Sequence, residues 1–330
     1  MINKVLARLR RKKVLGFVIA LIAIVFFLGY LELAGMDAKG LMRTGLLAMT
    51  PLALAATGEC INQKAGVINI GMEGIFLISC VIGVYGAELF GSGIAGLLIG
   101  SLTGALIGFI FGIMSVYGRA NQVVAGMGIN IFGMGMVAYL LMSIWAFPGI
   151  HMFPRELMLP TVSTPLGRLS PMIFVAIIVA IMAHILLHKT LFGLRIRAAG
   201  EKPEAVDVAG VRVDRIRIFT CTFGAALCGL GGAFMALGWF GCIVKEITAG
   251  RGFIVLACVV VAGLEPLLAL AAAFIFGFAE GFAFTAMIGT KGFLPYFLLM
   301  LPYIVTLVVV TIFIGSRKFP KAIGKPYIRE

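Results

Sequence analysis

Long apolar stretches, separated by short polar segments, follow one another along almost the whole chain. Many have close to the ~20 residues that an α-helix needs to cross the hydrocarbon core of a membrane. Because the stretches are continuously apolar, and because backbone groups in lipid must be paired within their own segment, the pattern predicts transmembrane helices and not a β-barrel. About ten spans are predicted, at residues 14–33, 41–57, 67–89, 94–117, 123–147, 171–189, 217–240, 247–264, 267–288 and 294–315.

The two ends of the chain are basic and flank this apolar region. The first apolar run, from Val14 to Leu33, is longer than the ~7–15 residues of a signal-peptide core, so we expect an uncleaved first helix. The chain then divides into a basic N-terminal segment with its helix at residues 1–40, a transmembrane domain at 41–315, and a basic cytoplasmic tail at 316–330.

The segments between the spans differ greatly in length. Residues 190–216 are long, polar and dense in charges of both signs. Residues 148–170 are also long and contain four prolines, which favours either an irregular cap over a pore mouth or an inert connector. In contrast, only Glu265 and Pro266 separate the eighth and ninth spans, which predicts a tight hairpin.

The composition agrees with a membrane protein, because 61% of the residues are hydrophobic, 12% are charged, and the mean hydropathy is +1.11. In a soluble protein a net charge of +13 would suggest nucleic acid as a partner, but here the charges lie between the spans and act as topology signals. With both termini in the cytoplasm, most of the 27 Lys and Arg residues fall on the inside. We therefore expect membrane lipid, and no nucleic acid, as a partner of the basic ends.

Two distant segments of the chain are similar to each other. The eight residues that begin at Gly74 align with the eight that begin at Gly252, an offset of 178 positions. Under the predicted topology the two segments cross the membrane in opposite directions. Inverted repeats of this kind are common in transporters, where the solute path lies at the repeat interface.

Glycines at every fourth position form a stripe on one face of the span 94–117. Small residues at this spacing let two helices approach closely, so that van der Waals contacts hold them together. The stripe predicts helix packing inside one subunit, or else at an interface between subunits. It consists of Gly96, Gly100, Gly104, Gly108 and Gly112.

Polar side chains inside apolar spans are candidates for the solute path, because a charge at the bilayer centre costs at least ~2.5 kcal/mol. Asn69 and Glu73 lie among glycines that predict a broken start of the span 67–89, where backbone groups would face a cavity. If that helix were intact, the two side chains would share one face. Asn130 and Glu280 are further candidates, and each could instead form a structural hydrogen bond between helices.

Arg251 lies near the predicted outer boundary, within the segment Thr248–Phe253. Its guanidinium could pair with Glu246 or Glu73, face the solute, or extend to the membrane interface. Sequence alone leaves these alternatives open.

The sequence lacks the motifs that are typical of ATP hydrolysis, catalysis and metal binding. The chain has no Gly-rich phosphate-binding loop that ends in Lys-Ser/Thr, so it is not expected to hydrolyse ATP. His151, His184 and His188 match no catalytic spacing, and the six cysteines form no CxxC pair or Cys/His cluster. The sequence therefore predicts no enzyme activity, no cofactor and no metal site, and a solute pump of this kind would need an external energy source.

The segment 190–216 resembles the cytoplasmic coupling loop of ABC importer permeases of the simple-sugar, nucleoside and branched-chain amino acid group. Glu204, Ala205 and Gly210 match the Glu-Ala-Ala-x-x-x-Gly pattern of those permeases, although Val206 replaces the second Ala. Pro203 suits the first turn of a short helix, and Glu204 and Asp207 near its start favour the helix dipole. The residues 65–74 and 248–257, and the tail from Leu301 to Glu330, are similar to the same family and closest to its nucleoside-type permeases.

The resemblance implies an all-α type II importer permease with ten spans, in the inner membrane of a bacterium. It also implies two cytoplasmic ATPase subunits, a second permease subunit that is more often a paralogue than a copy, and an extracytoplasmic solute-binding lipoprotein. A nucleoside is the expected solute, with a simple sugar or a nucleoside-like compound as alternatives. The resemblance assigns ATPase coupling to Glu204, Ala205 and Gly210, and Pro203 and Asp207 join them as residues that favour the short helix.

Three other functions compete with this interpretation. A secondary transporter could use Glu73 and Glu280 as proton or ion sites. A channel would need a ring of pore-lining residues and no coupling loop. A membrane-embedded enzyme would need a catalytic constellation, which the motifs above do not provide.

Overall fold

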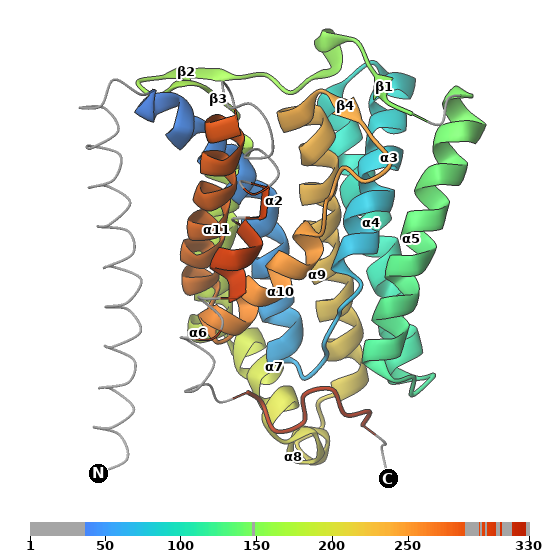
Figure 1. The fold of residues 1–330 in the computed structure, drawn as a ribbon. Coiled ribbons are helices and arrows are strands. Elements are labelled where there is room, and N and C mark those ends of the chain that lie inside the picture. The colour runs from blue at the N-terminus through green and yellow to red at the C-terminus, as the bar shows by residue number, and fades with distance from the viewer. Residues whose placement is uncertain are drawn as a thin grey trace.

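The computed structural model describes residues 37–146, 149–287, 297, 299–300, 302–307, 311 and 319–327. Within these residues the chain is a helical bundle, and seven helices are long and apolar enough to cross a membrane (Figure 1). They are α2 (Ala38–Lys64), α3 (Met72–Phe90), α4 (Gly93–Val116), α5 (Gln122–Trp145), α6 (Met172–Lys189), α9 (Val213–Phe234, continued by the π-helical η2, Met235–Phe240) and α11 (Pro266–Met287).

The prediction of a polytopic helical membrane protein is therefore confirmed. The predicted first span at 14–33, and most of the last at 294–315, lie outside the described residues. The total of ten spans stays a prediction.

The predicted span 247–264 is wrong as a full crossing. Its helix, α10 (Arg251–Ala262), has 12 residues and rises about 18 Å, well short of the ~30 Å hydrocarbon core. The preceding residues form turns, with positive φ at Ala249 and Gly250. The hydropathy of 247–264 could not show this, because the turn residues Ile247, Ala249 and Gly250 are themselves apolar or small.

Helix α2 extends seven residues beyond the predicted end of its span at residue 57. The residues beyond this predicted end include the polar Glu59, Asn62 and Gln63. In the structure their side chains are buried and hydrogen-bonded to one another, so they add no cost of contact with lipid. Hydropathy therefore underestimates the length of a helix whose polar side chains face the protein interior.

The predicted break at the start of the third span is confirmed. Helix α2 ends at Lys64 and α3 begins at Met72, and residues 67–70 have no helical structure. This connecting segment, residues 65–71, rises from one end of the bundle to the point partway along it where α3 begins (Figure 1). Asn69 therefore lies before the helix that carries Glu73, not on its face.

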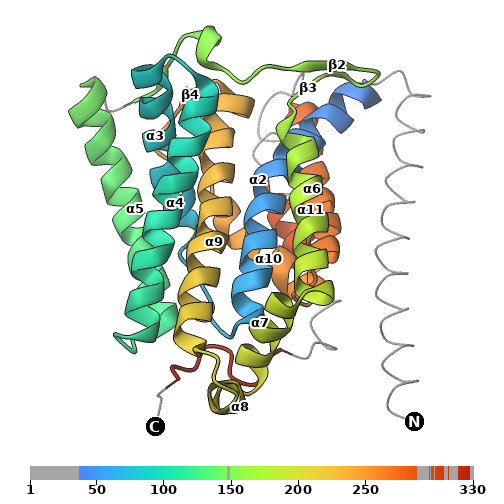
Figure 2. The ribbon, with the colours of Figure 1, turned by 180° about the vertical axis from the view of Figure 1, so that it is seen from behind.

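Helices α4 and α9 pack closely through the predicted glycine stripe (Figure 2). A Cβ on Gly104 would meet the Ala225 carbonyl oxygen at 2.3 Å, and a Cβ on Gly100 would meet the Ala233 Cβ at 2.4 Å. At the end of the stripe, Gly96 faces Gly83 and Ala87 of α3. These contacts lie within one chain, and they leave no room for a side chain.

The two ends of the bundle carry different structures (Figure 1). One end, here called the sheet end, carries β1 (His151–Met152), η1 (Arg155–Leu157), β2 (Val162–Thr164), β3 (Gly167–Leu169) and β4 (Cys242–Ile243). Strand β1 pairs with β4 and β2 with β3, so the segment 149–170 is a structured cover over the bundle rather than an irregular one. The opposite end, here called the α8 end, carries α7 (Leu191–Glu201), α8 (Pro203–Val208) and the tail residues 319–327.

Candidate functional site

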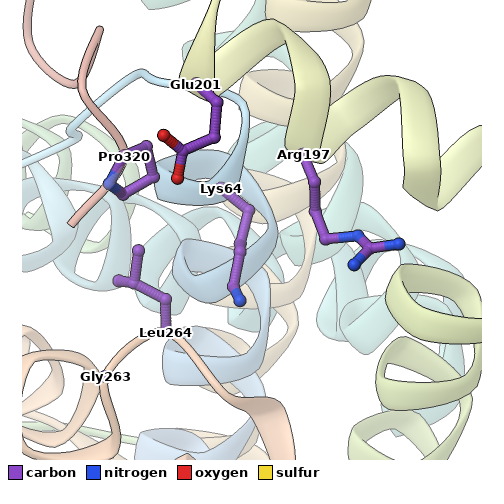
Figure 3. Close-up of a pocket in the computed structure, with 6 residues that line it drawn as sticks. All are labelled: Lys64, Arg197, Glu201, Gly263, Leu264 and Pro320. Atoms are coloured by element: carbon purple, nitrogen blue, oxygen red, sulfur yellow. The ribbon is translucent and has the colours of Figure 1, made fainter. Parts of the chain in front are cut away.

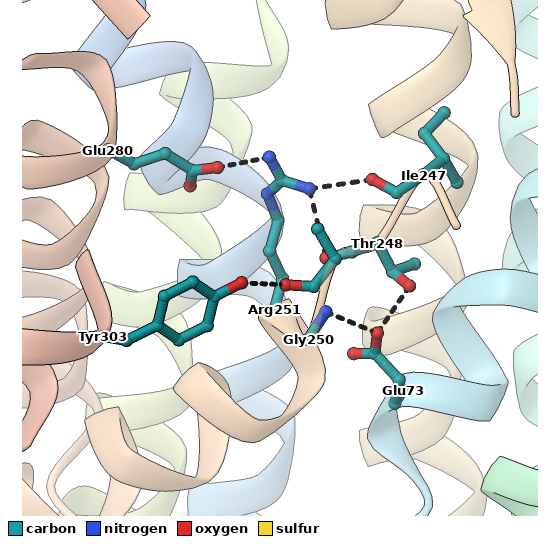
Figure 4. A network of polar contacts seen from close by, with 8 residues as sticks. Glu73, Ile247, Thr248, Gly250, Arg251, Glu280 and Tyr303 are labelled. Carbon is teal, nitrogen blue, oxygen red and sulfur yellow. Dashed lines mark hydrogen bonds and ion pairs between the residues drawn. The ribbon is translucent and has the colours of Figure 1, made fainter. Parts of the chain in front are cut away.

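The carboxylate of Glu73 joins the beginnings of two helices (Figure 4). Its Oε1 accepts hydrogen bonds from the Thr248 hydroxyl at 2.6 Å and the Gly250 amide at 2.7 Å. Its Oε2 accepts a bond from the Gly252 amide at 2.6 Å. These amides belong to the first turn of α10, and Glu73 itself lies in the first turn of α3. An anionic acceptor suits this place, because the unpaired amides and the dipole of a helix N-terminus favour negative charge.

A buried ion pair lies beside this junction. Arg251, the first residue of α10, pairs with Glu280 of α11, and its Nη1 also donates to the carbonyl oxygens of Ile247 at 2.8 Å and Thr248 at 3.1 Å. The guanidinium lies 4.9 Å from the centre of the Trp239 ring, within cation–π distance. Of the partners considered from sequence, neither Glu73 nor Glu246 forms an ion pair with Arg251 in the described part of the chain.

A hydrogen bond from another helix also reaches this turn. The Tyr303 hydroxyl donates to the carbonyl oxygen of Ala249, one of the residues with positive φ before α10 (Figure 4). Side chains from α3, α11 and the segment around Tyr303 thus hold the start of α10. Thr248 and Tyr303 were not singled out from sequence, because a lone Thr or Tyr in an apolar segment gives no signal of its partner.

A cavity of about 290 Å³ opens at the Glu73 junction. Its volume is at the lower end of the range for small-molecule sites, and its wall combines apolar side chains with a few polar groups. It is lined by Glu73, Leu77, Met134, Lys245, Glu246, Thr248, Ala249, Gly250 and Phe253.

The non-helical segment 65–71 has its backbone groups paired by side chains. The amide of Ile68 donates to Gln122 Oε1 at 2.8 Å, and that of Asn69 donates to Glu59 Oε1 at 2.9 Å. Asn130 bonds the segment twice, because its Nδ2 donates to the Ile70 carbonyl at 3.0 Å and its Oδ1 accepts from the Gly74 amide at 2.9 Å. These bonds replace helical ones, which a segment at membrane depth requires.

The predicted solute-path residues therefore fall into two groups. Glu73 lies on the cavity wall, while Arg251 and Glu280 form the ion pair beside it. Asn69 and Asn130 instead hold the segment 65–71, where the Asn69 side chain accepts from the Gly71 amide at 2.8 Å.

Glu59 and Arg217 are buried ionisable residues that sequence reasoning did not select. Both are at most 2% exposed. The Arg217 Nε donates to the carbonyl of Ala65 at 3.2 Å, and its Nη1 donates to that of Lys325 at 2.9 Å. Glu59 could have been noticed as an acid close to a predicted span, whereas the partners of Arg217 are 108 or more residues away in sequence.

Helix α8 presents a surface at the end of the bundle. Pro203 occupies the first turn as predicted, and Pro203 and Val206 are buried against the neighbouring helices. Ala205 and Glu204 point outward, and Val208 is 91% exposed. Gly210 ends this unit with φ +79°, a conformation that other residues rarely adopt. An exposed apolar side chain next to an acid on a short rigid helix suits contact with another protein.

The tail residues 319–327 connect α8 with the segment 65–71. The Tyr327 hydroxyl donates to Asp207 Oδ2 at 3.1 Å, and the Lys325 carbonyl accepts from Arg217. The Gly324 amide donates to the Gly66 carbonyl at 3.0 Å. A continuous set of hydrogen bonds thus extends from α8, through the tail, to the segment that leads into the Glu73 junction.

The described fold and this site are those of a polytopic helical transport protein, with a small, mostly apolar cavity at the Glu73 junction and a short exposed helix at one end. Comparison with known proteins supplies the family. The model of the family described as the permease component of the branched-chain amino acid transport system matches residues 41–310, and the chain belongs to this family. It is thus the permease component of an ABC transporter, as the coupling-loop resemblance predicted.

Three similar proteins cover most of the chain. The nucleoside ABC transporter permease protein NupC of Lactococcus lactis is 32% identical over 86% of this chain and 95% of its own length. The guanosine ABC transporter permease protein NupQ of Bacillus subtilis is 33% identical over the same shares. The nucleoside ABC transporter permease protein NupB of Lactococcus lactis is 26% identical over 80% of this chain and 79% of its own. No solved structure matches the chain.

Proposed function

We propose that this chain carries nucleosides across the inner membrane as one permease subunit of an ATP-driven importer. The observation that carries the proposal is the similarity of this chain, over 86% of its length, to two permeases whose names specify nucleoside and guanosine. The cavity at Glu73 supports it, since a neutral polar solute needs a few hydrogen-bonding groups on an otherwise apolar wall.

In this proposal the solute passes the Glu73 junction. The cavity is lined by residues at the start of α3 and in the turn before α10. The chain segments that lead to these two places come from opposite ends of the bundle (Figure 1). Gly250 and Phe253 border it on one side, and Leu77 and Met134 on the other. Glu73 positions the two helix starts around the solute, and its bonded carboxylate is not required to take up a proton.

The same junction supports an inverted repeat. Glu73 and Arg251 are separated by 178 positions, the offset of the sequence alignment, and each lies in the first turn of a helix that begins partway along the bundle. Helix α3 extends from there towards the sheet end and α10 towards the α8 end (Figure 1). We propose that these two helices rock against each other during transport, as paired repeats do in other transporters.

Helix α8 is proposed as the docking site for the ATPase. Glu204, Ala205 and Val208 would enter a groove on that subunit, and Gly210 would allow the turn that follows. Movement of α8 would reach the segment 65–71 through Tyr327, the tail and Arg217. The α8 end is then cytoplasmic, together with both chain termini, and the sheet end faces an extracytoplasmic solute-binding lipoprotein.

The second permease subunit is proposed to be a paralogue. Lactococcus lactis has two nucleoside permease proteins similar to this chain, and the chain is closer in sequence to NupC than to NupB. A NupB-type protein would therefore be its partner. Cytoplasmic ATPase subunits would hydrolyse the ATP.

The ion-driven alternative is not favoured. Glu280 is paired with Arg251, and both oxygens of Glu73 accept hydrogen bonds from fixed groups. Neither acid is therefore arranged to exchange an ion or proton with a passing solute, and the family couples transport to ATP.

Reconstitution tests the proposal directly. The permease pair, ATPase subunits and binding protein would be placed in liposomes, and uptake of labelled guanosine, glucose and leucine would be compared. We expect ATP-dependent uptake of guanosine, with little of the other two. Preference for glucose or leucine would contradict the nucleoside assignment, and uptake by this chain alone under a pH gradient would contradict the coupling.

A further inference from the structure

Two histidines and a glutamate from distant parts of the sequence meet towards the α8 end. His184 and His188 lie one turn apart on α6, and Glu265 lies in the turn between α10 and α11. The Glu265 Oε2 is 3.2 Å from His188 Nε2 and 3.9 Å from His184 Nδ1. The three ligand atoms are all within 4.8 Å of one another.

The contact of His188 with a backbone carbonyl shows which of its ring nitrogens carries a proton. Its Nδ1 lies 3.1 Å from the carbonyl oxygen of His184, and a carbonyl only accepts, so Nδ1 carries the proton. In the neutral ring Nε2 then presents a lone pair towards the carboxylate of Glu265. Two acceptors at 3.2 Å repel each other unless a cation lies between them. Backbone-bonded Nδ1–H with a free Nε2 is also how metal-binding histidines are oriented.

Glu265 is held from its other side. Lys64, the last residue of α2, contacts Glu265 Oε1 at 3.1 Å, whereas Oε2 faces the histidines. One oxygen is thus fixed by an ammonium group, and the other is directed at the two rings. This is the outer support that a ligating carboxylate needs, because it sets the orientation of the ligand atom.

A cavity of about 270 Å³ borders two neighbours of Glu265, although the three candidate ligands are not part of its wall. Lys64 and Leu264, which precedes Glu265, both line it (Figure 3). The ring and carboxylate side chains are only 19–34% exposed, so an ion bound by them would lose part of its water shell.

We infer that His184, His188 and Glu265 bind a divalent transition-metal ion of the Zn²⁺ type. Imidazole nitrogens and a carboxylate oxygen are ordinary Zn²⁺ ligands at about 2.0–2.2 Å, and water would complete a tetrahedron. In such a site the ligand atoms are about 3.3 Å apart, which the Glu265–His188 pair matches at 3.2 Å, whereas the His184 ring at 3.9 Å would move closer to Glu265 on binding. The ion would link α6 to the α10–α11 turn, and α2 would be joined to the site only through the Lys64–Glu265 ion pair. Sequence spacing did not predict it because Glu265 is 77 residues from His188 (265 − 188).

Metal binding to the purified, tag-free full-length chain tests this inference without any transport assay. Equilibrium dialysis against buffered Zn²⁺, followed by elemental analysis, should give one ion per chain. Replacing one ligand in His188→Ala should weaken binding by roughly 100-fold or more, since even outer-shell changes cost 10–100-fold. His151→Ala is the matched control, because it removes the histidine at the sheet end and should leave binding unchanged.

Thermal unfolding gives a second measurement of Zn²⁺ binding, which compares several variants. Zn²⁺ bound only to the folded chain should raise the melting temperature of the wild type and of His151→Ala. It should not raise that of His188→Ala or Glu265→Gln, whose folding is checked by their melting without metal. A wild type that binds no Zn²⁺, or equal binding in all variants, would overturn the metal site and leave a proton as the cation between His188 and Glu265.

Discussion

Two helix contacts in this protein are built in opposite ways. Helices α4 and α9 meet through glycines and small side chains, with backbone against backbone. Helices α3 and α10 meet through their first turns, and the carboxylate of Glu73 accepts the amides of Gly250 and Gly252. The first contact depends on the absence of side chains and the second on one charged side chain. The comparison suggests that α4 and α9 move as one body, whereas the α3–α10 contact can open and close.

The largest effect is expected from filling the α4–α9 contact. In Gly104→Leu the new Cβ would lie 2.3 Å from the Ala225 carbonyl oxygen, which belongs to backbone and cannot move aside. Overpacking typically costs about 1–3 kcal/mol, and we expect the upper end or a failure to fold. Thermal unfolding in detergent would measure this.

Gly128→Leu is the matched control for that variant. Gly128 is also in the middle of a helix, α5, but a Cβ there has open space. It should therefore fold normally. Equal destabilisation by the two variants would mean that the stripe has no special packing role.

The second largest effect is expected from a change at Glu73 in the α3–α10 contact. Glu73→Gln keeps the shape but replaces one oxygen with an amide group that donates, so at least one of its three donors loses its acceptor. An unsatisfied buried group costs about 1–3 kcal/mol. We expect guanosine uptake by the assembled transporter to fall at least tenfold, while most of the protein still folds.

The α4–α9 contact could be recognised from the sequence, whereas the partners in the α3–α10 contact could not, and the reason is physical. A four-residue spacing of glycines is local, so Gly96 to Gly112 could be recognised on one helix face before any partner was known. Glu73 could be marked as a costly acid, but its donors Thr248 and Gly250 are more than 170 residues away. Hydropathy also placed α10 as a full span, because the residues in the turns at its ends are apolar or small and add to the apolar run.

A third and smaller effect is expected at Gly210. Its φ of +79° costs a residue with a side chain about 1–3 kcal/mol, although a Cβ there meets nothing within 4 Å. Gly210→Val should distort the turn after α8 and lower solute-stimulated ATPase activity several-fold, with little change in melting temperature. Unchanged ATPase activity would remove the basis for assigning α8 as the coupling helix.

The smallest effect is expected from Tyr327→Phe. This change removes one hydroxyl, which donates to Asp207 at 3.1 Å, and such a bond contributes about 0.5–1.5 kcal/mol. Guanosine uptake per ATP hydrolysed should fall modestly if the tail transmits movement from α8. A parallel loss of uptake and hydrolysis, with their ratio unchanged, would argue against that role.

Solute protection of an engineered cysteine tests the central claim, that the cavity at Glu73 lies on the solute path. Phe253→Cys would be placed on the cavity wall, and Leu102→Cys on the exposed outer face of α4, in a background that lacks Cys242. A water-soluble thiol reagent should label Phe253→Cys in the assembled transporter but not Leu102→Cys. Turnover with guanosine should slow that labelling, and labelling that is absent or insensitive to guanosine would contradict the account.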